Sequence, residues 1–286
     1  MTKTSKIVLA ILGVVIVSLV GGYIGAGLRG GSSAAASDSN VPVNGAFIQK
    51  IKDAGELRVG VALSPPLTAQ QPDGSLGGPN IIPLQELAAE LGVKLTPVAA
   101  DWNNIVAGLQ ADRYDFAANL DATVERSLSI QFTIPVYEYQ GVFGVKADSP
   151  YKTAQDVIDA KKPIATIQGQ APEAALKATG ATVQPIDNTT NALNTVNAGR
   201  AIAVFTDVGT VEALAYADPT IKIIVPDPAI YTATANYGVP ANIDPWSLQT
   251  VNIAIQRAIN SGRMTQAYAE VKYYEVENLP DDLRKK

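Results

Sequence analysis

The stretch "VKLTPVAADWNNIVAGLQADRYDFAANLDATVERS" (93–127) decides the fold, because two β-rich runs in it flank one amphipathic run. Residues 93–99 and 115–120 are short runs of β-forming and apolar residues and predict strands. Between them, 102–113 places its apolar residues at helical spacing and predicts a helix. This strand–helix–strand order predicts a mainly parallel sheet with helices on its faces.

The same alternation continues on both sides of this stretch. Upstream, "LRVGVAL" (57–63) predicts a strand, and "LQELAAELG" (84–92) predicts a helix that stops at its glycine. The second half predicts helices at 154–162, 171–180, 190–199 and 208–217, and strands at 163–169, 182–186 and 201–207. Two α/β units of similar plan, without a residue-level repeat, indicate two lobes.

Two extended, glycine-containing segments are the predicted crossings between the lobes. They are "YQGVFGVKAD" (139–148) and "YTATANYGVPA" (231–241). The helical patterns that follow the second segment then return the chain to the first unit. We therefore expect lobe one at 46–140 plus 232–286 and lobe two at 141–231, with a hinge at the crossings and a cleft between the lobes.

The N-terminal part predicts export. The uncharged run "IVLAILGVVIVSLVGGYIGAGL" (7–28) follows two lysines, and at about 1.5 Å per residue it can cross a hydrocarbon core of about 30 Å. Residues 1–29 are therefore predicted as a hydrophobic membrane helix, and 30–45 as a flexible tether. A cleaved signal segment is the alternative, since the small residues at 32–37 offer a cleavage site. Both interpretations export the rest of the chain to the periplasm or the outer face of the membrane.

Composition argues against several classes of site. The chain has 286 residues, no Cys, no His and a formal net charge of -5. Disulfides, thiolate chemistry, His-based triads and the usual zinc sites are therefore excluded, and we expect neither a metal nor a cofactor. A mildly acidic chain without a basic stripe also argues against a nucleic-acid partner.

Candidate binding residues follow the predicted strands, because ligands of open α/β sheets bind beyond the carboxyl ends of strands. Arg126 offers a planar fork for a carboxylate, Trp102 a flat apolar face, and Asp207 an anion for an ammonium group. Each also has a structural alternative. Arg126 could form a surface ion pair with Glu125 or Asp121. Trp102 could pack between the lobes, and Asp207 could be a helix N-cap. The other candidates at such positions are Ser64, Asn119, Asp121, Thr123 and Gln170.

Several blocks of this sequence resemble a known family. The block "DATVERS" followed by "FTIPVYEY" (121–139) is the most specific, and "GELRVGVALSPPL" (55–67), "ATIQGQAPEAAL" (165–176), "AVFTDVGTVEALA" (203–215) and "INSGRMTQAY" (259–268) accompany it. Together they look like family-three extracellular solute-binding proteins, the polar amino-acid receptors of ABC importers. The resemblance implies a two-lobed periplasmic-binding-protein fold that closes on an amino acid and delivers it to an importer permease.

The resemblance also implies roles for individual residues. The Arg of the family's T-x-x-R motif, which binds the ligand α-carboxylate, falls on Arg126. The stacking aromatic residue falls on Trp102, and the Asp that meets the ligand ammonium falls on Asp207. Where many members carry hydroxyls, however, this chain has Asn119 and Asp121. A carboxylate at Asp121 repels an anionic ligand group unless a cation neutralises it.

A second departure lies in lobe two. Members commonly read G-T-T where this chain has "GQA" (169–171), so hydroxyl donors are missing beside Gln170. Some relatives act as dehydratases on cyclic carboxylates with a cleft acid as proton donor, for which Glu173 or Asp121 are candidates here. We therefore expect a non-enzymatic receptor, with a cyclic-carboxylate dehydratase or a sensory ligand-binding module as alternatives.

Overall fold

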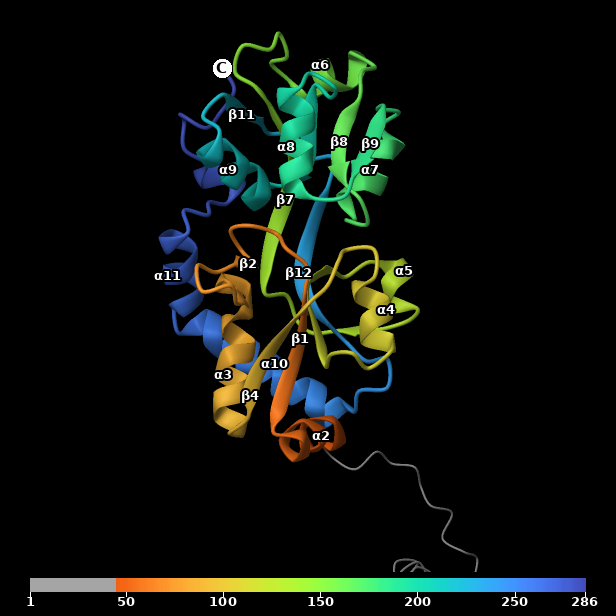
Figure 1. Cartoon of the computed structure of the whole chain (residues 1–286), viewed down its shortest axis with the longest axis vertical. Coiled ribbons are helices and arrows are strands. Elements are labelled where there is room, and N and C mark those ends of the chain that lie inside the picture. Colours follow the sequence, from red (N-terminus) through yellow and green to blue (C-terminus); the bar gives the residue numbers. More distant parts are fainter. Residues whose placement is uncertain (1–44) are drawn as a thin grey trace, which may run out of the picture. The chain divides into compact units, whose positions relative to one another are not determined.

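The computed structural model describes residues 45–286, which Figure 1 shows as alternating strands and helices. The predicted membrane segment (7–28) and nearly all of the predicted tether (30–45) lie outside the described residues. Within residues 45–286, no helix combines the length and the apolar character needed to cross a membrane.

Lobe one contains elements from both ends of the described chain. They are α2 (Ala46–Ala54), β1 (Glu56–Val61), β2 (Ala69–Gln70), β3 (Leu76–Gly77), η1 (Pro79–Ile81), α3 (Ile82–Leu91), β4 (Lys94–Ala99), α4 (Ile105–Gln110), β5 (Phe116–Asp121), α5 (Val124–Ser127), β6 (Gln131–Phe132), β12 (Thr232–Val239), α10 (Pro245–Asn260) and α11 (Arg263–Glu270). Strand β1 pairs in parallel with β4 and β5, whereas β12 runs antiparallel to β5. Parallel pairing brings the carboxyl ends of β1, β4 and β5 to one edge of the sheet.

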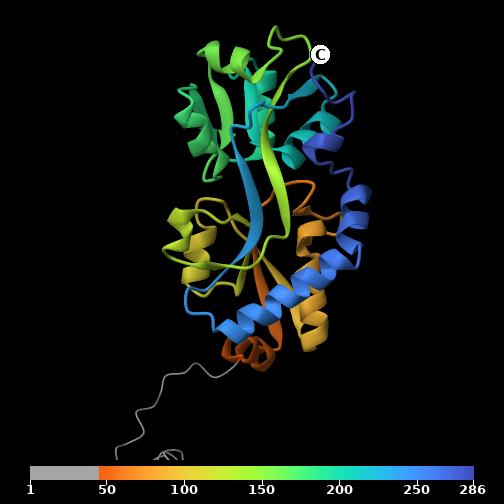
Figure 2. The same cartoon turned by 180° about the vertical axis from the view of Figure 1, so that it is seen from behind.

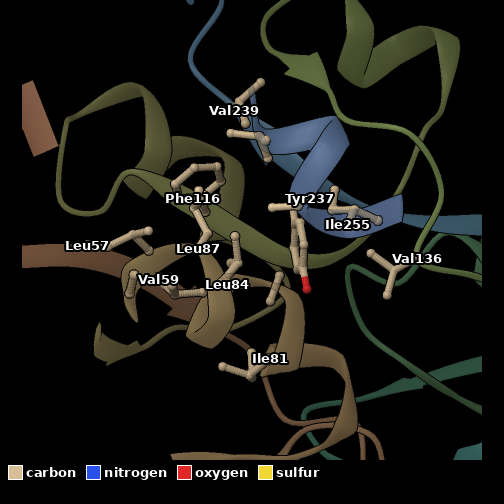
Figure 3. Packing of buried hydrophobic residues seen from close by; sticks show 14 of the residues in the cluster. Leu57, Val59, Ile81, Leu84, Leu87, Phe116, Val136, Tyr237, Val239 and Ile255 are labelled. Carbon is tan, nitrogen blue, oxygen red and sulfur yellow. The ribbon is translucent and has the colours of Figure 1, made fainter. Parts of the chain in front are cut away.

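The core of lobe one packs helices α3 and α10 against this sheet. Figure 3 shows its buried side chains gathered around Phe116 and Tyr237, whose rings meet edge to face with centroids 6.4 Å apart. The Tyr237 hydroxyl donates to the Asn80 carbonyl at 2.6 Å, so its polar end is satisfied as well. Each large apolar side chain buried here contributes roughly 1.5–3 kcal/mol, which holds the strand ends in place.

Lobe two contains the middle of the chain. Its elements are β7 (Tyr137–Lys146), α6 (Ala154–Asp159), β8 (Ile164–Ile167), α7 (Pro172–Ala178), β9 (Val183–Ile186), α8 (Thr189–Asn197), β10 (Ala203–Asp207), α9 (Val208–Ala217) and β11 (Ile221–Ile224). Strand β8 pairs in parallel with β9 and β10, whereas β10 and β11 run antiparallel to β7. The carboxyl ends of β8, β9 and β10 therefore also lie at one edge.

Strands β7 and β12 connect the lobes. Residues 232–235 of β12 pair with residues 137–140 of β7, and residues 141–145 of β7 continue into pairing with β10. One strand therefore belongs to both sheets, and Figures 1 and 2 show β7 and β12 side by side between the lobes. These strands coincide with the extended segments predicted at 139–148 and 231–241.

We expected all of 232–286 to belong to lobe one, and the structure corrects this for the last residues. The Ile223 amide donates to the Leu283 carbonyl, and the Lys285 amide donates to the Ile223 carbonyl, both at 2.8 Å. Leu279 and Leu283 pack in an apolar cluster of lobe two, and Figure 2 shows the chain running from α11 to the end marked C there. The chain thus crosses between the lobes a third time, because the edge strand β11 offers unpaired backbone groups to a segment without a strand pattern.

The sequence patterns also do not predict helix α2, strand β11 or the short hairpin β2–β3. The helix predicted at 102–113 is shorter in the structure and begins at Ile105. The reason is a turn in which the Asp101 carbonyl accepts hydrogen bonds from the Asn104 amide at 3.0 Å and the Ile105 amide at 2.9 Å. Short elements of this kind depend on tertiary contacts more than on local periodicity.

A buried carboxyl group anchors the third crossing. Glu212 of α9 is fully buried, and its two carboxyl oxygens accept hydrogen bonds from the Tyr274 amide at 3.2 and 3.1 Å. Burial raises the pKa of Glu212 from 4.5 to about 8, with a further contribution from the negative charge of Asp207, while the Tyr274 hydrogen bond lowers it. The folded protein therefore holds a proton on Glu212 more tightly than the unfolded chain does.

We predict that this carboxyl group makes the protein less stable as the pH rises. Since the folded pKa lies above the unfolded one, the contribution to stability is fully present below pH 4.5 and declines until about pH 8. The decline should be on the order of 2–4 kcal/mol. Glu212→Gln stays neutral at every pH. The free energy of unfolding, measured in urea at pH 5 to 8.5, should therefore fall less with rising pH in the variant than in the parent protein. An equal fall in the two proteins would contradict this assignment.

Candidate ligand-binding site

A pocket lies between the lobes at the carboxyl ends of the strands. Its volume is only about 20 Å³, far below the range typical of ligand sites, so the lobes leave little free space between them in this structure. The pocket is lined by Ser64, Trp102, Asn119, Asp121, Arg126, Tyr137, Tyr139, Gln170, Ala171, Pro172 and Asp207. All the binding residues predicted from the sequence line it except Thr123, and the candidate acid Glu173 does not line it.

Arg126 is presented by a short strand-to-helix turn. The Thr123 side chain caps α5 by accepting a hydrogen bond from the Arg126 amide at 3.2 Å, so Thr123 positions the turn behind the pocket. The guanidinium donates from Nη1 to the Asp121 carbonyl at 3.2 Å and from Nη2 to the Gly169 carbonyl at 3.3 Å. Among residues 45–286 it forms no ion pair, with Glu125, Asp121 or any other acid. Its charge is therefore not neutralised by a direct carboxylate contact.

Asp207 caps helix α9 and also lines the pocket, so it takes both positions that the sequence suggested for it. Its Oδ1 accepts from the Thr210 amide of α9 at 2.8 Å, and its Oδ2 lies 3.2 Å from the Thr206 hydroxyl and accepts weakly from the Ser64 hydroxyl at 3.5 Å. Burial raises the pKa of Asp207, and these hydrogen bonds oppose that effect. Ser64 comes from lobe one, so the last bond joins the two lobes across the pocket.

Asp121 is buried at the end of β5 and bonded to the hinge. Its Oδ2 accepts hydrogen bonds from the hydroxyls of Tyr139 and Tyr231, each at 2.8 Å. Burial raises the pKa of Asp121, the two hydroxyls and the charge of Arg126 lower it, and the charge of Asp207 raises it. Tyr139 and Tyr231 carry no motif of their own, and only their places in the two predicted crossings could have pointed to them.

Three further candidates use their polar groups within the protein. Asn119, at a positive φ of 59°, donates to the Thr68 hydroxyl at 2.9 Å and accepts from the Asn80 amide at 2.7 Å. The Gln170 side-chain carbonyl accepts from the Thr206 hydroxyl at 2.6 Å. The Ser64 hydroxyl lies 3.2 Å from that of Thr210. These contacts make the pocket wall rigid, in place of the free hydroxyl donors that the resemblance suggests.

Trp102 lines the pocket from the turn before α4. Its indole Nε1 donates to the Leu63 carbonyl at 3.3 Å, and its ring is half-buried against apolar residues of both lobes. The packing role and the pocket-lining role therefore coexist. Tyr137 and Tyr139 of β7 add two more rings, with centroids 5.9 Å apart. Three aromatic rings thus line the pocket.

We predict that Asn119→Ala destabilises the protein by about 2–4 kcal/mol, because the side-chain amide of buried Asn80 loses its acceptor and alanine disfavours a positive φ. Asn119→Gly loses the same hydrogen bonds but tolerates the backbone, so it should be less destabilised by about 1 kcal/mol. Urea unfolding of the three proteins measures both effects. An alanine variant as stable as the parent would show that the Asn119 amide is not structural.

Comparison with known proteins identifies the family. Residues 57–273 match the family model described as "Bacterial extracellular solute-binding proteins, family 3". A "Probable amino-acid ABC transporter-binding protein" of Haemophilus influenzae is 29% identical over 145 residues, which are 50% of this chain and 55% of that protein. "L-cystine-binding protein TcyJ" of Escherichia coli is 30% identical over 116 residues, 39% of this chain and 43% of that protein. The matched part of the chain thus spans about half the length of these relatives.

Solved structures share the fold. An amino acid ABC transporter substrate-binding protein from Streptococcus pneumoniae, bound to L-arginine, has a TM-score of 0.72 and 26% identity, covering 80% of this chain and 99% of that one. The ancestral amino acid-binding protein AncCDT-1, a precursor of cyclohexadienyl dehydratase, has a TM-score of 0.68 and 26% identity, covering 78% and 97%. The predicted periplasmic-binding-protein fold is confirmed for the described residues. The chain belongs to the bacterial extracellular solute-binding proteins of family 3.

Proposed function

We propose that this protein captures an amino acid between its lobes and delivers it to an ABC-type importer. The observation that carries this proposal is one pocket lined by Arg126 from lobe one and Asp207 from lobe two, with Arg126 in no ion pair among the described residues. An amino acid carries one anionic and one cationic group, so it complements this pair. In a half-buried site, such charge-assisted hydrogen bonds are stronger than neutral ones.

In this proposal, the ligand α-carboxylate binds Arg126 and the ammonium group binds Asp207. Trp102 covers the apolar part of the ligand, while Ser64, Asn119, Thr123 and Gln170 hold the pocket wall. The two lobes already touch here, through Arg126 and Gly169 and through Ser64 and Asp207. Ligand entry therefore requires the lobes to part, and binding favours the closed form that the permease receives.

A catalytic role receives less support from the geometry. Of the two acids considered as proton donors, Glu173 does not line the pocket and pairs with Lys177 on its own helix. Asp121 lines it, but both tyrosine hydroxyls already donate to its carboxylate. We therefore propose a binding protein that is not an enzyme. Its place outside the cytoplasmic membrane follows the family description, and we propose that residues 7–28 direct it there, either as an anchor or as a cleaved signal.

Calorimetry against a panel of amino acids tests the proposed function. We expect saturable binding of at least one amino acid and a loss of about 2–4 kcal/mol in Arg126→Ala, roughly 30- to 1,000-fold in Kd. The matched control is Arg257→Ala, because Arg257 pairs with Glu90 at 2.7 Å on the surface of α10 and α3. Absence of binding by the parent protein, or an unchanged Kd in Arg126→Ala, would refute the proposal.

We predict that Gly169→Ala weakens binding by opposing lobe closure. Gly169 has a φ of +83°, and an added Cβ would lie 2.5 Å from the Asn103 Oδ1 of lobe one. Gly199→Ala is the matched control, since Gly199 has a φ of +67° with nothing within 4 Å. Both variants carry backbone strain of about 1–2 kcal/mol, but only Gly169→Ala should raise Kd, by about tenfold. Small-angle scattering should show the lobes of Gly169→Ala further apart than those of Gly199→Ala.

A further inference from the structure

The charges around the pocket do not balance. Asp121 and Asp207 are both buried in its wall, and among the lining residues Arg126 is the cationic one. An amino acid with a neutral side chain has no net charge, so binding it leaves the negative excess unchanged. A buried charge without a compensating partner is costly, because little water remains to solvate it.

The hydrogen bonds of Asp121 leave one of its oxygens available. Tyr139 and Tyr231 both donate to Oδ2, and Oδ1 accepts no hydrogen bond from the described residues. Arg126 bonds only the backbone carbonyl of Asp121 and not its carboxylate. The protein therefore fixes the position of this carboxylate through the hinge tyrosines without neutralising it.

The surroundings of Asp121 favour a cation. Asp121 and Asp207 line the same pocket, so their carboxylates repel each other across it. The rings of Trp102, Tyr137 and Tyr139 line the same space, and aromatic faces attract ammonium and guanidinium groups. A second positive group on the ligand would relieve the repulsion and also contact these rings.

We propose that the ligand carries a second cationic group, which the Asp121 carboxylate binds, and that Asp121 thereby makes the receptor selective for amino acids of net positive charge. This inference rests on the proposed function. The ligand class is an α-amino acid with an amine or guanidine side chain, whose net charge of +1 balances the pocket. Asp121 is then a specificity-determining residue, at a position where the family resemblance suggests a hydroxyl.

The test compares cationic amino acids with neutral analogues of the same shape. Calorimetry of the full chain measures Kd for arginine against citrulline and for lysine against norleucine. We expect the cationic member of at least one pair to bind ten-fold or more tightly. In Asp121→Asn, which keeps the shape and an acceptor for the tyrosines, that preference should fall to less than three-fold while the neutral analogue still binds.

Asp53→Asn is the matched control, because it makes the same change at an exposed residue of α2, which accepts a hydrogen bond from Gln49 and does not line the pocket. It should retain the preference, and thermal unfolding confirms that each variant is folded. Equal binding of both members of each pair by the parent protein, or a preference that survives Asp121→Asn, would overturn this inference and leave the proposed function standing. No binding of any amino acid would overturn both.

Discussion

Strand β7 hydrogen-bonds to both sheets, and the relation between the two lobes depends on this sharing. Its first residues pair with β12 in lobe one, and its later residues pair with β10 and β11 in lobe two. Rotation of one lobe against the other must therefore bend β7, β12 and the C-terminal crossing together. Because the parallel strands of both lobes end beside these connections, the residues that follow them meet in one pocket.

The three buried or half-buried charges of the pocket are stabilised in three different ways. Asp207 is stabilised by the N-terminus of α9, Asp121 by two tyrosine hydroxyls, and Arg126 by backbone carbonyls from both lobes. None of them neutralises another through a direct ion pair, so the protein maintains separated charges in a largely buried site. Separated and fixed charges of this kind favour a ligand that carries complementary charges at matching positions. The hinge tyrosines also connect ligand-facing Asp121 to the strands that bend.

Much of the site could be predicted by one rule, that ligands bind beyond the carboxyl ends of strands. The rule selected Arg126, Asp121 and Asp207, because each directly follows or ends a recognisable strand. The rule also selected Asn119, but it could not show that its side-chain amide is used by Asn80 and Thr68, which are far away in the sequence. It also did not find Tyr231, because an aromatic residue in an extended segment looks the same whether it faces solvent or a buried carboxylate.

The sequence by itself determined the α/β class, the order of the main strands and helices, the two crossing strands and the family, since these depend on local periodicity and on contiguous motifs. Tertiary structure alone decided where the last residues lie, because β11 recruits Leu283 and Lys285 through backbone groups that carry no sequence signal. It also decided that the Asp121 carboxylate accepts hydrogen bonds from the hinge tyrosines and not from Arg126. That choice depends on which side chains burial brings within hydrogen-bonding distance, and no local pattern specifies it.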